Sequence, residues 1–163
     1  MKLYVRNKIF SLGGGSTVKD EQKNDVYKVK GKVFSPTHKK KIYNLKNEHL
    51  FTVRNKFWHW LTRRAFIFNA QGEKIATLSN NTYSRKFIVE DYVDEIEIIG
   101  HAFQFGLSVK KGEQEIGTIT RQLTFIGDAF VCETDDEQLM PFLVALTIAM
   151  DNIDDDKVKD WDK

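Results

Sequence analysis

Lysine side chains recur at every second position of the segment 26–34, which reads VYKVKGKVF. Lys28, Lys30 and Lys32 alternate there with apolar residues, a period of two that predicts a β-strand with one apolar and one basic face. Three further lysines, at 39–41, follow the short turn 35–38. Such a cluster attracts anionic lipid, at about 1 kcal/mol per charge near a membrane, and it can equally attract nucleic acid. The alternative is a solvated wall whose lysines protect strand edges.

Aromatic and basic residues also stand together in the segment 57–64, which reads FWHWLTRR. Trp58 and Trp60 are candidates for contact with a membrane, because tryptophan beside arginine is typical of the lipid–water interface. The alternative is that Phe57, Trp58 and Leu61 cover one end of the barrel and the arginines are ordinary surface residues. The candidate lipid-binding residues of the chain are Lys28, Lys30, Lys32, Lys39, Lys40, Lys41, Arg63 and Arg64.

The residue types that usually carry catalysis or hold metals form no complete pattern. The glycines at 13–15 are not followed by the Gly-Lys-Ser/Thr of a phosphate-binding loop, so we interpret them as part of a flexible hairpin. No two of the four histidines are spaced i, i+4, and Cys132 has no CxxC partner. The acidic run 151–156 lacks the glycine and glutamate of a calcium loop. We therefore predict no catalytic residue, no metal site and no cofactor, and a protein that is not an enzyme.

The net charge of +2 conceals an uneven distribution along the chain. Residues 1–65 hold 16 basic and 4 acidic side chains, a net charge of +12, whereas residues 66–163 hold 9 and 19, a net charge of −10. This asymmetry is consistent with an oriented electrostatic surface. The alternative is that the two halves interleave in space and neutralise one another.

Length and composition are those of one globular domain. The chain has 163 residues, 41% of them hydrophobic and 29% charged, and a single cysteine. We expect a barrel domain over residues 1–153, followed by an acidic tail over 154–163. The absence of an apolar leader and of disulfide partners favours a cytoplasmic location, with peripheral attachment to a membrane as a further expectation.

Strand patterns dominate the sequence up to about residue 134. Turns with Gly, Asn or Asp separate short alternating segments, and a long meander of this kind must close or sandwich to hide its edges. The expected strands, about twelve in number, lie near 2–10, 15–20, 25–35, 39–44, 49–56, 64–69, 73–79, 86–91, 95–100, 103–111, 115–121 and 128–134.

The last segment predicts one helix of unusual character. Residues 139–150 are apolar in every helical direction, with Thr147 as the only polar interruption. Twelve residues rise roughly 18 Å, too little to cross the hydrocarbon of a bilayer, so we expect the helix to be buried in the protein. Thr134–Glu137 has the pattern of a capping box, and Pro141 would break or kink a helix that began there. The predicted core residues of this helix are Leu139, Phe142, Leu143, Leu146, Ile148 and Met150.

The predicted fold is therefore mainly β, a closed antiparallel barrel of about twelve strands around a buried C-terminal hydrophobic helix. Because the helix fills the interior, a small-molecule site inside the barrel is not expected.

The order of these segments resembles the LURP-one-related proteins, which share the tubby C-terminal fold with the phospholipid scramblases. The resemblance spans residues 2–153 and rests on the segments 3–35, 41–57 and 63–80 and on the apolar helix that ends in Ala149–Asn152. It implies a twelve-stranded barrel around a central hydrophobic helix. Tubby domains bind phosphoinositide through surface Lys and Arg, but their binding residues do not match this sequence position by position.

The leading expectation for function is a non-enzymatic binding module for anionic phospholipid or phosphoinositide, acting through the basic N-terminal half. A protein-interaction or structural scaffold that self-associates through its oppositely charged halves is the alternative. We favour lipid or protein over nucleic acid as the partner, and we expect no transmembrane segment.

Overall fold

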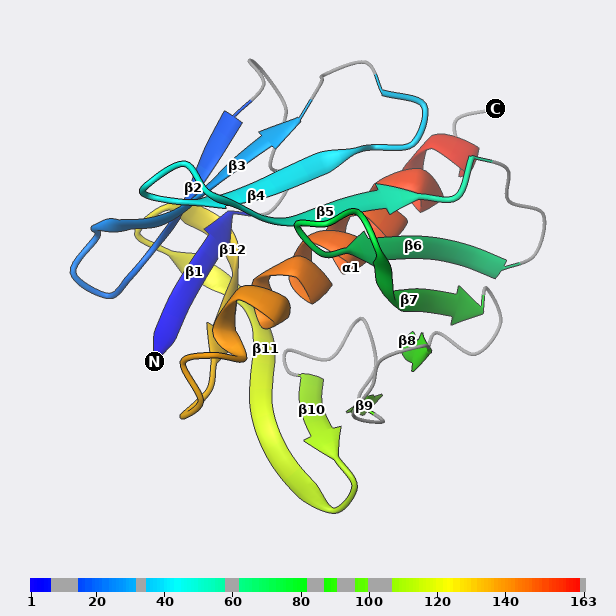
Figure 1. Ribbon diagram of the computed structural model, residues 1–163. Coiled ribbons are helices and arrows are strands. Elements are labelled where there is room, and N and C mark those ends of the chain that lie inside the picture. Colours follow the sequence, from blue (N-terminus) through cyan, green and yellow to red (C-terminus); the bar gives the residue numbers. More distant parts are fainter. Residues whose placement is uncertain are drawn as a thin grey trace.

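A single antiparallel sheet of twelve strands wraps around one C-terminal helix in the computed structural model (Figure 1). The structure describes residues 1–6, 15–31, 35–57, 62–81, 87–90, 96–99 and 107–161. The strands are β1 (Lys2–Arg6), β2 (Gly15–Lys19), β3 (Asp25–Gly31), β4 (Lys40–Asn44), β5 (His49–Asn55), β6 (Thr62–Phe68), β7 (Lys74–Asn81), β8 (Phe87–Glu90), β9 (Ile96–Ile99), β10 (Leu107–Lys111), β11 (Gln114–Thr124) and β12 (Gly127–Glu133). The predicted mainly-β barrel with a C-terminal helix is confirmed.

The barrel is nearly closed rather than closed. Strand β1 pairs with β12 over five positions, from Lys2 with Glu133 to Arg6 with Ala129, so the two ends of the strand region meet in one sheet. Strands β8 and β9 form the two edges of the hydrogen-bonded order, and their described residues lie beside each other without ladder pairing. Both strands span four residues. The barrel predicted from the sequence is therefore present in a nearly closed form.

Along each strand, side chains point alternately toward the helix and toward the outside of the barrel. In β3 the side chains of Tyr27 and Val29 are buried, while Lys30 is exposed and Lys28 is half-buried. In β6 the side chains of Ala65 and Ile67 are fully buried in the same way. This period of two is the pattern that identified the strands.

The β4–β5 hairpin and the β6–β7 hairpin have turns of the same type. In the β4–β5 turn the Asn44 side chain accepts a hydrogen bond from the Glu48 backbone N–H at 2.9 Å and donates one to the Glu48 carboxylate. Asn69 makes the same pair of contacts to Glu73 in the β6–β7 turn. The left-handed position is taken by Asn47 in the first turn and by Gly72 in the second, two residue types that tolerate positive φ.

Helix α1 (Met140–Trp161) runs through the middle of the curved sheet (Figure 1). Its side chains are buried on every side from Phe142 to Ile153, and Leu139 just before it is half-buried. Phe142 meets Phe51 of β5 edge to face, with ring centroids 6.3 Å apart. The helix has no polar face because the barrel wall surrounds it.

The helix begins at Met140, after a separate turn at the predicted capping box, as the position of Pro141 led us to expect. Thr134 Oγ1 accepts a hydrogen bond from the Asp136 N–H and donates one to the Ile116 carbonyl, so it caps a separate turn and ties that turn to β11. The first helical hydrogen bond runs from the Leu143 N–H to the Leu139 carbonyl. Pro141 then lies in the first turn, where its missing N–H costs no hydrogen bond.

Candidate functional site

Lys28 and Lys30 share the outer face of β3, as the alternation predicted. The register of β3 on β4 sets Lys28 beside Tyr43 and Lys30 beside Lys41, so all of these side chains point away from the helix. Lys30 Nζ lies 5.0 Å from the centre of the Tyr43 ring. Lys28 Nζ donates a hydrogen bond of 3.2 Å to the Asn47 side chain in the next turn. Both ammonium groups therefore contact neutral partners.

Lys40 does not belong to this outer face, which corrects its assignment as a lipid-binding candidate. It pairs with Gly31 and Val53 and shares the inner side of β4 with Ile42, so its side chain is buried. Consecutive strand residues point to opposite faces, so Lys40 and Lys41 could not both face outward. Lys39, before the strand begins, is exposed, and Lys32 lies outside the described residues.

The basic surface continues across β5, β6 and β7, where the sequence had not placed it. Arg54 of β5 pairs with Phe66 of β6, and its guanidinium lies 4.9 Å from the centre of the Phe68 ring. Lys74 of β7 lies beside Phe68 in the ladder, with its Nζ 5.9 Å from the centre of the Phe66 ring. Cations held over aromatic rings keep their charge and lose part of their conformational freedom.

Arg63 and Arg64, which the sequence predicted as lipid-binding candidates, point to opposite sides of strand β6. Arg64 pairs with Ser79 on the outer side of the ladder, whereas Arg63 pairs with Asn80. Asn80 is buried, and Arg63 shares the alternation of buried Ala65 and Ile67. By alternation Arg64 belongs to the outer row and Arg63 to the inner row of β6, and both side chains are partly exposed. Trp58 and Trp60 lie outside the described residues, so their membrane contact stays a prediction.

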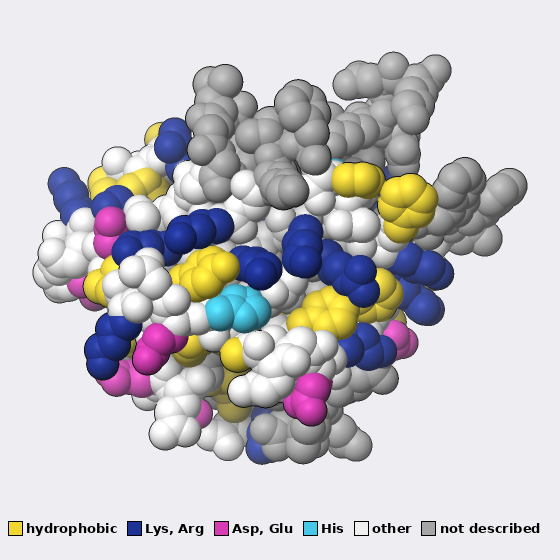
Figure 2. All heavy atoms as spheres, turned by 45° about the horizontal axis from the view of Figure 1, so that its top comes forward, with side chains coloured by type: hydrophobic (Ala, Val, Ile, Leu, Met, Phe, Trp, Pro, Cys, Tyr) yellow, Lys and Arg dark blue, Asp and Glu magenta, His cyan; other side chains and the backbone are white. Residues whose placement is uncertain are grey.

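We call the outer surface of strands β3 to β7 the basic face. Its cationic residues are Lys28, Lys30, Lys41, Arg54, Arg64 and Lys74, and its aromatic residues are Tyr43, Phe66 and Phe68. Figure 2 shows Lys and Arg side chains across this surface, with aromatic side chains and a histidine between them.

Acidic side chains are scarce on the basic face. Asp25 is the only Asp or Glu within strands β3 to β7, and it forms an ion pair with Lys19 of β2. Hydrogen bonds from Lys19 and Thr17 lower the pKa of the Asp25 carboxyl, so it stays ionised and matched to Lys19. Glu48 and Glu73 lie in the turns at the margin and are bound to Asn44 and Asn69. The centre of the face is therefore strongly positive.

Sequence reasoning missed Arg54, Lys74 and the outward aromatic residues for a physical reason. Phenylalanine is ordinarily a core residue, and the run Phe66–Phe68 reads as apolar throughout. The usable signal was the period of two, because Ala65 and Ile67 form one row while Arg64, Phe66 and Phe68 form the other.

No candidate for covalent or metal chemistry accompanies this surface. Cys132 is fully buried against α1, and burial raises the pKa of its thiol to about 12. Among the described residues no group of three His, Cys, Asp or Glu side chains comes together to hold a metal ion. The basic face can bind anions through its positive charge and through the cations that lie over its aromatic rings.

The model of the LURP-one-related family matches residues 1–151, which is most of the chain. The chain belongs to this family. No curated protein and no solved structure gives a significant match. The family is not known as a family of enzymes, and membership together with the barrel fold is compatible with a non-enzymatic binding module. Within the described ranges no helix is long and apolar enough to cross a bilayer.

Proposed function

We propose that this protein is a non-enzymatic module that binds membranes rich in anionic phospholipid through its basic face. The observation that carries the proposal is the gathering of six cationic side chains on β3 to β7, with one acidic residue in those five strands. A basic residue near an anionic leaflet contributes about 1 kcal/mol, so several acting together give measurable binding without a deep pocket.

The geometry favours a broad anionic surface over a single small ligand. The cations of the basic face are spread over five neighbouring strands, and adjacent strands lie about 4.8 Å apart. Such a spread matches an extended sheet of headgroups, whose potential falls off within a Debye length of about 10 Å at 0.1 M salt. Binding should therefore weaken steeply when salt is added.

The test is sedimentation of the protein with phosphatidylcholine vesicles that contain or lack phosphatidylserine, at low and at high salt. The wild type is expected to sediment only with the anionic vesicles and only at low salt. The triple variant Lys41→Gln, Arg54→Gln and Lys74→Gln removes three outward cations and should bind much more weakly. Lys40 is left unchanged, because its burial would make any loss ambiguous.

A matched control removes the same charge from another surface. Lys2, Lys110 and Lys111 lie on β1 and β10, outside the basic face, and their replacement by Gln should leave vesicle binding unchanged. Equal losses in both triple variants would overturn the proposal, because binding would then follow net charge alone. Binding of a single-stranded oligonucleotide more tightly than vesicles would favour nucleic acid. Salt-sensitive self-association with no vesicle binding would favour a scaffold.

A further inference from the structure

One histidine, His49 of β5, lies on the basic face. It pairs with Tyr43 of β4, and the centroids of the two rings are 5.5 Å apart. The register of β4 on β5 shifts between Ile42 and Tyr43, so His49 joins the outer row although Phe51, two residues further on, packs on Phe142 of the helix. The His49 side chain is half-buried, so protons can reach it from solvent.

The contacts of His49 accommodate both of its charge states. Its Nε2 lies 2.9 Å from Thr52 Oγ1. A hydroxyl group can accept a hydrogen bond from a ring N–H or donate one to a bare ring nitrogen, so this contact survives protonation. The neighbouring Tyr43 ring can contact an imidazolium as well as a neutral imidazole, because aromatic rings attract cations. Protonation therefore changes the charge of the face without a rearrangement of the strand.

Lysine and aromatic side chains surround His49 on the neighbouring strands. Lys30 Nζ lies 5.0 Å from the centre of the Tyr43 ring that His49 also contacts. Three of the neighbouring groups are lysines, and none is acidic. The side chains beside His49 and its partner Thr52, from strands β3, β4 and β6, are Lys28, Lys30, Lys41, Tyr43 and Phe68.

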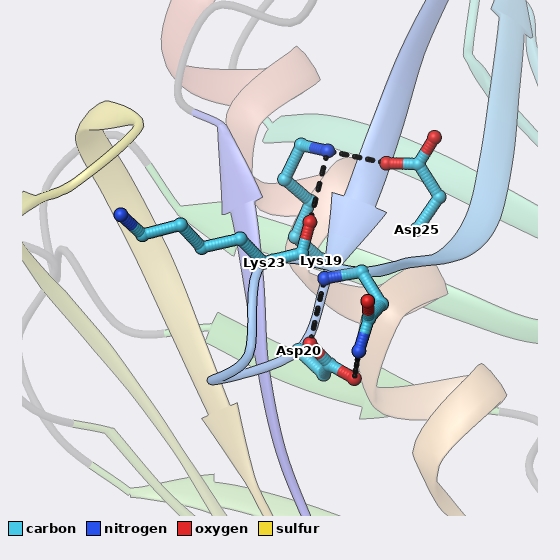
Figure 3. Close-up of polar contacts among 5 residues, drawn as sticks. Lys19, Asp20, Lys23 and Asp25 are labelled. Atoms are coloured by element: carbon cyan, nitrogen blue, oxygen red, sulfur yellow. Dashed lines mark hydrogen bonds and ion pairs between the residues drawn. The ribbon is translucent and has the colours of Figure 1, made fainter.

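No carboxylate serves as a counter-ion for His49 among the described residues. The segment 25–81, which contains strands β3 to β7, has three acidic residues: Asp25, Glu48 and Glu73. Asp25 is paired with Lys19 of β2, as Figure 3 shows. Glu48 and Glu73 are bound to asparagine side chains in their own turns. A proton taken up by His49 therefore adds a full positive charge to the face.

We propose that His49 makes membrane binding by the basic face sensitive to pH, with stronger binding when the imidazole is protonated. This inference rests on the proposed function and adds a regulation of the same site. Histidine is the side chain whose charge ordinarily changes between about pH 5 and pH 8. An anionic membrane has a surface potential of about −30 mV, which favours an added cation on the bound face. Proton uptake and membrane binding therefore strengthen each other.

The experiment measures binding to vesicles that contain phosphatidylglycerol, near pH 8 and near pH 6 at constant ionic strength. The charge of this lipid comes from a phosphodiester and is the same at both values. The wild type should bind about fivefold more tightly near pH 6, the effect of one added charge. His49→Gln should bind at both values as the wild type does near pH 8. His49→Lys carries a charge at both values and should bind as the wild type does near pH 6.

His38 provides the matched control. It is also half-buried, but it lies in the turn before β4, outside the basic face. Its φ is positive, so the control is His38→Asn, a residue that tolerates this conformation. This variant should keep the full dependence on pH. Circular dichroism and thermal melting verify that each variant is folded.

Proton NMR of the imidazole rings gives a readout that does not depend on the strength of binding. The His49 signal, identified by its absence from His49→Gln, should titrate at a higher pH with micelles of short-chain phosphatidylglycerol than with micelles of short-chain phosphatidylcholine. An identical midpoint in the two micelles would contradict the inference, because the proton would not be linked to the anionic surface.

The outcomes separate this inference from the proposed function. If His49→Gln keeps the change in binding between the two pH values, the titrating group lies elsewhere and the inference is wrong. Equal binding of the wild type at both values would also overturn it and would leave the proposed function standing. Absence of vesicle binding at either value would overturn both.

Discussion

Lys40 Nζ lies 3.3 Å from Asp151 Oδ2, and only 6% and 3% of the two side chains are exposed. The pair joins the barrel wall at β4 to helix α1 inside the protein. Nearby, the Asn55 side chain of β5 donates to the Asn152 carbonyl, and the Asn152 side chain donates to the His38 carbonyl. These polar contacts fix the rotation of a helix whose apolar surface could otherwise pack in several orientations.

Removing one member of this pair should be strongly destabilising. Lys40→Met leaves the Asp151 carboxylate buried beside an apolar side chain, at a cost of about 3–5 kcal/mol in the free energy of unfolding. The double variant Lys40→Met and Asp151→Leu buries no new charge and should recover much of that loss. Urea unfolding of the single and double variants measures the coupling. If the losses of the two single variants simply add, the ion pair does not act as a unit.

Alternation within strands was enough to predict most of the fold. The strand segments could be read from the sequence because a half-buried strand alternates apolar and polar residues with a period of two. The helix could be read because a helix enclosed on every side is apolar in all directions. The run Lys39–Lys41 has no such period within itself. The signal that marked Lys40 as the inward member was apolar Ile42, two residues further on in the same row.

The candidate site was less accessible to sequence reasoning because it depends on distant segments. Lys28 and Lys30 could be found within one strand, but the basic face joins them to Arg54 of β5 and Lys74 of β7. Only the order of the strands in the sheet brings these side chains to one surface.

The helix core should be intolerant of truncation. Leu146 is fully buried inside the barrel. Leu146→Ala should lower the free energy of unfolding by about 2–5 kcal/mol, because it loses buried apolar area and leaves a cavity. Leu123→Ala, at an exposed leucine, is the matched control and should change it by less than about 0.5 kcal/mol. Leu146→Asp should not fold. A Leu146→Asp protein with the thermal melt of the wild type would contradict the enclosed helix.

Gly117 of β11 lies close to helix α1 and to strand β12. A Cβ atom built there would lie 2.8 Å from Leu143 Cδ1 and 2.9 Å from the Glu133 carbonyl oxygen. The leucine can move aside, but the backbone oxygen of β12 cannot move without disturbing the ladder. Gly117→Ala should therefore destabilise the protein by about 1–3 kcal/mol. Gly15→Ala is the control, since its Cβ would meet only the Val29 carbonyl at 3.7 Å. Equal melting temperatures for the two variants would show that the barrel wall moves to accept the Cβ atom at position 117 and would contradict the prediction.

The Cys132 thiol should be chemically silent in the folded protein. Its sulfur lies 3.1 Å from Thr147 Oγ1 of the helix, and burial raises its pKa from 9.0 to about 12 despite that contact. The thiolate is the reactive form of cysteine. Near pH 8 the Cys132 thiol of the folded protein is protonated and buried, so it should not react. A disulfide-exchange reagent such as DTNB should label Cys132 only as fast as the protein opens, and urea should accelerate the labelling.

The raised pKa also sets a direction for stability at high pH. The unfolded thiol ionises near 9, whereas the folded thiol stays protonated to about 12. The contribution of the buried thiol is therefore complete below pH 9 and is lost as the pH rises toward 12. The variant Cys132→Ala should show a smaller loss of stability than the wild type over this interval.

An exposed cysteine, Glu113→Cys in the Cys132→Ala background, is the positive control for labelling. Labelling of Cys132 at the rate of this exposed thiol would place the sulfur outside the barrel and contradict the packing of β12 on the helix.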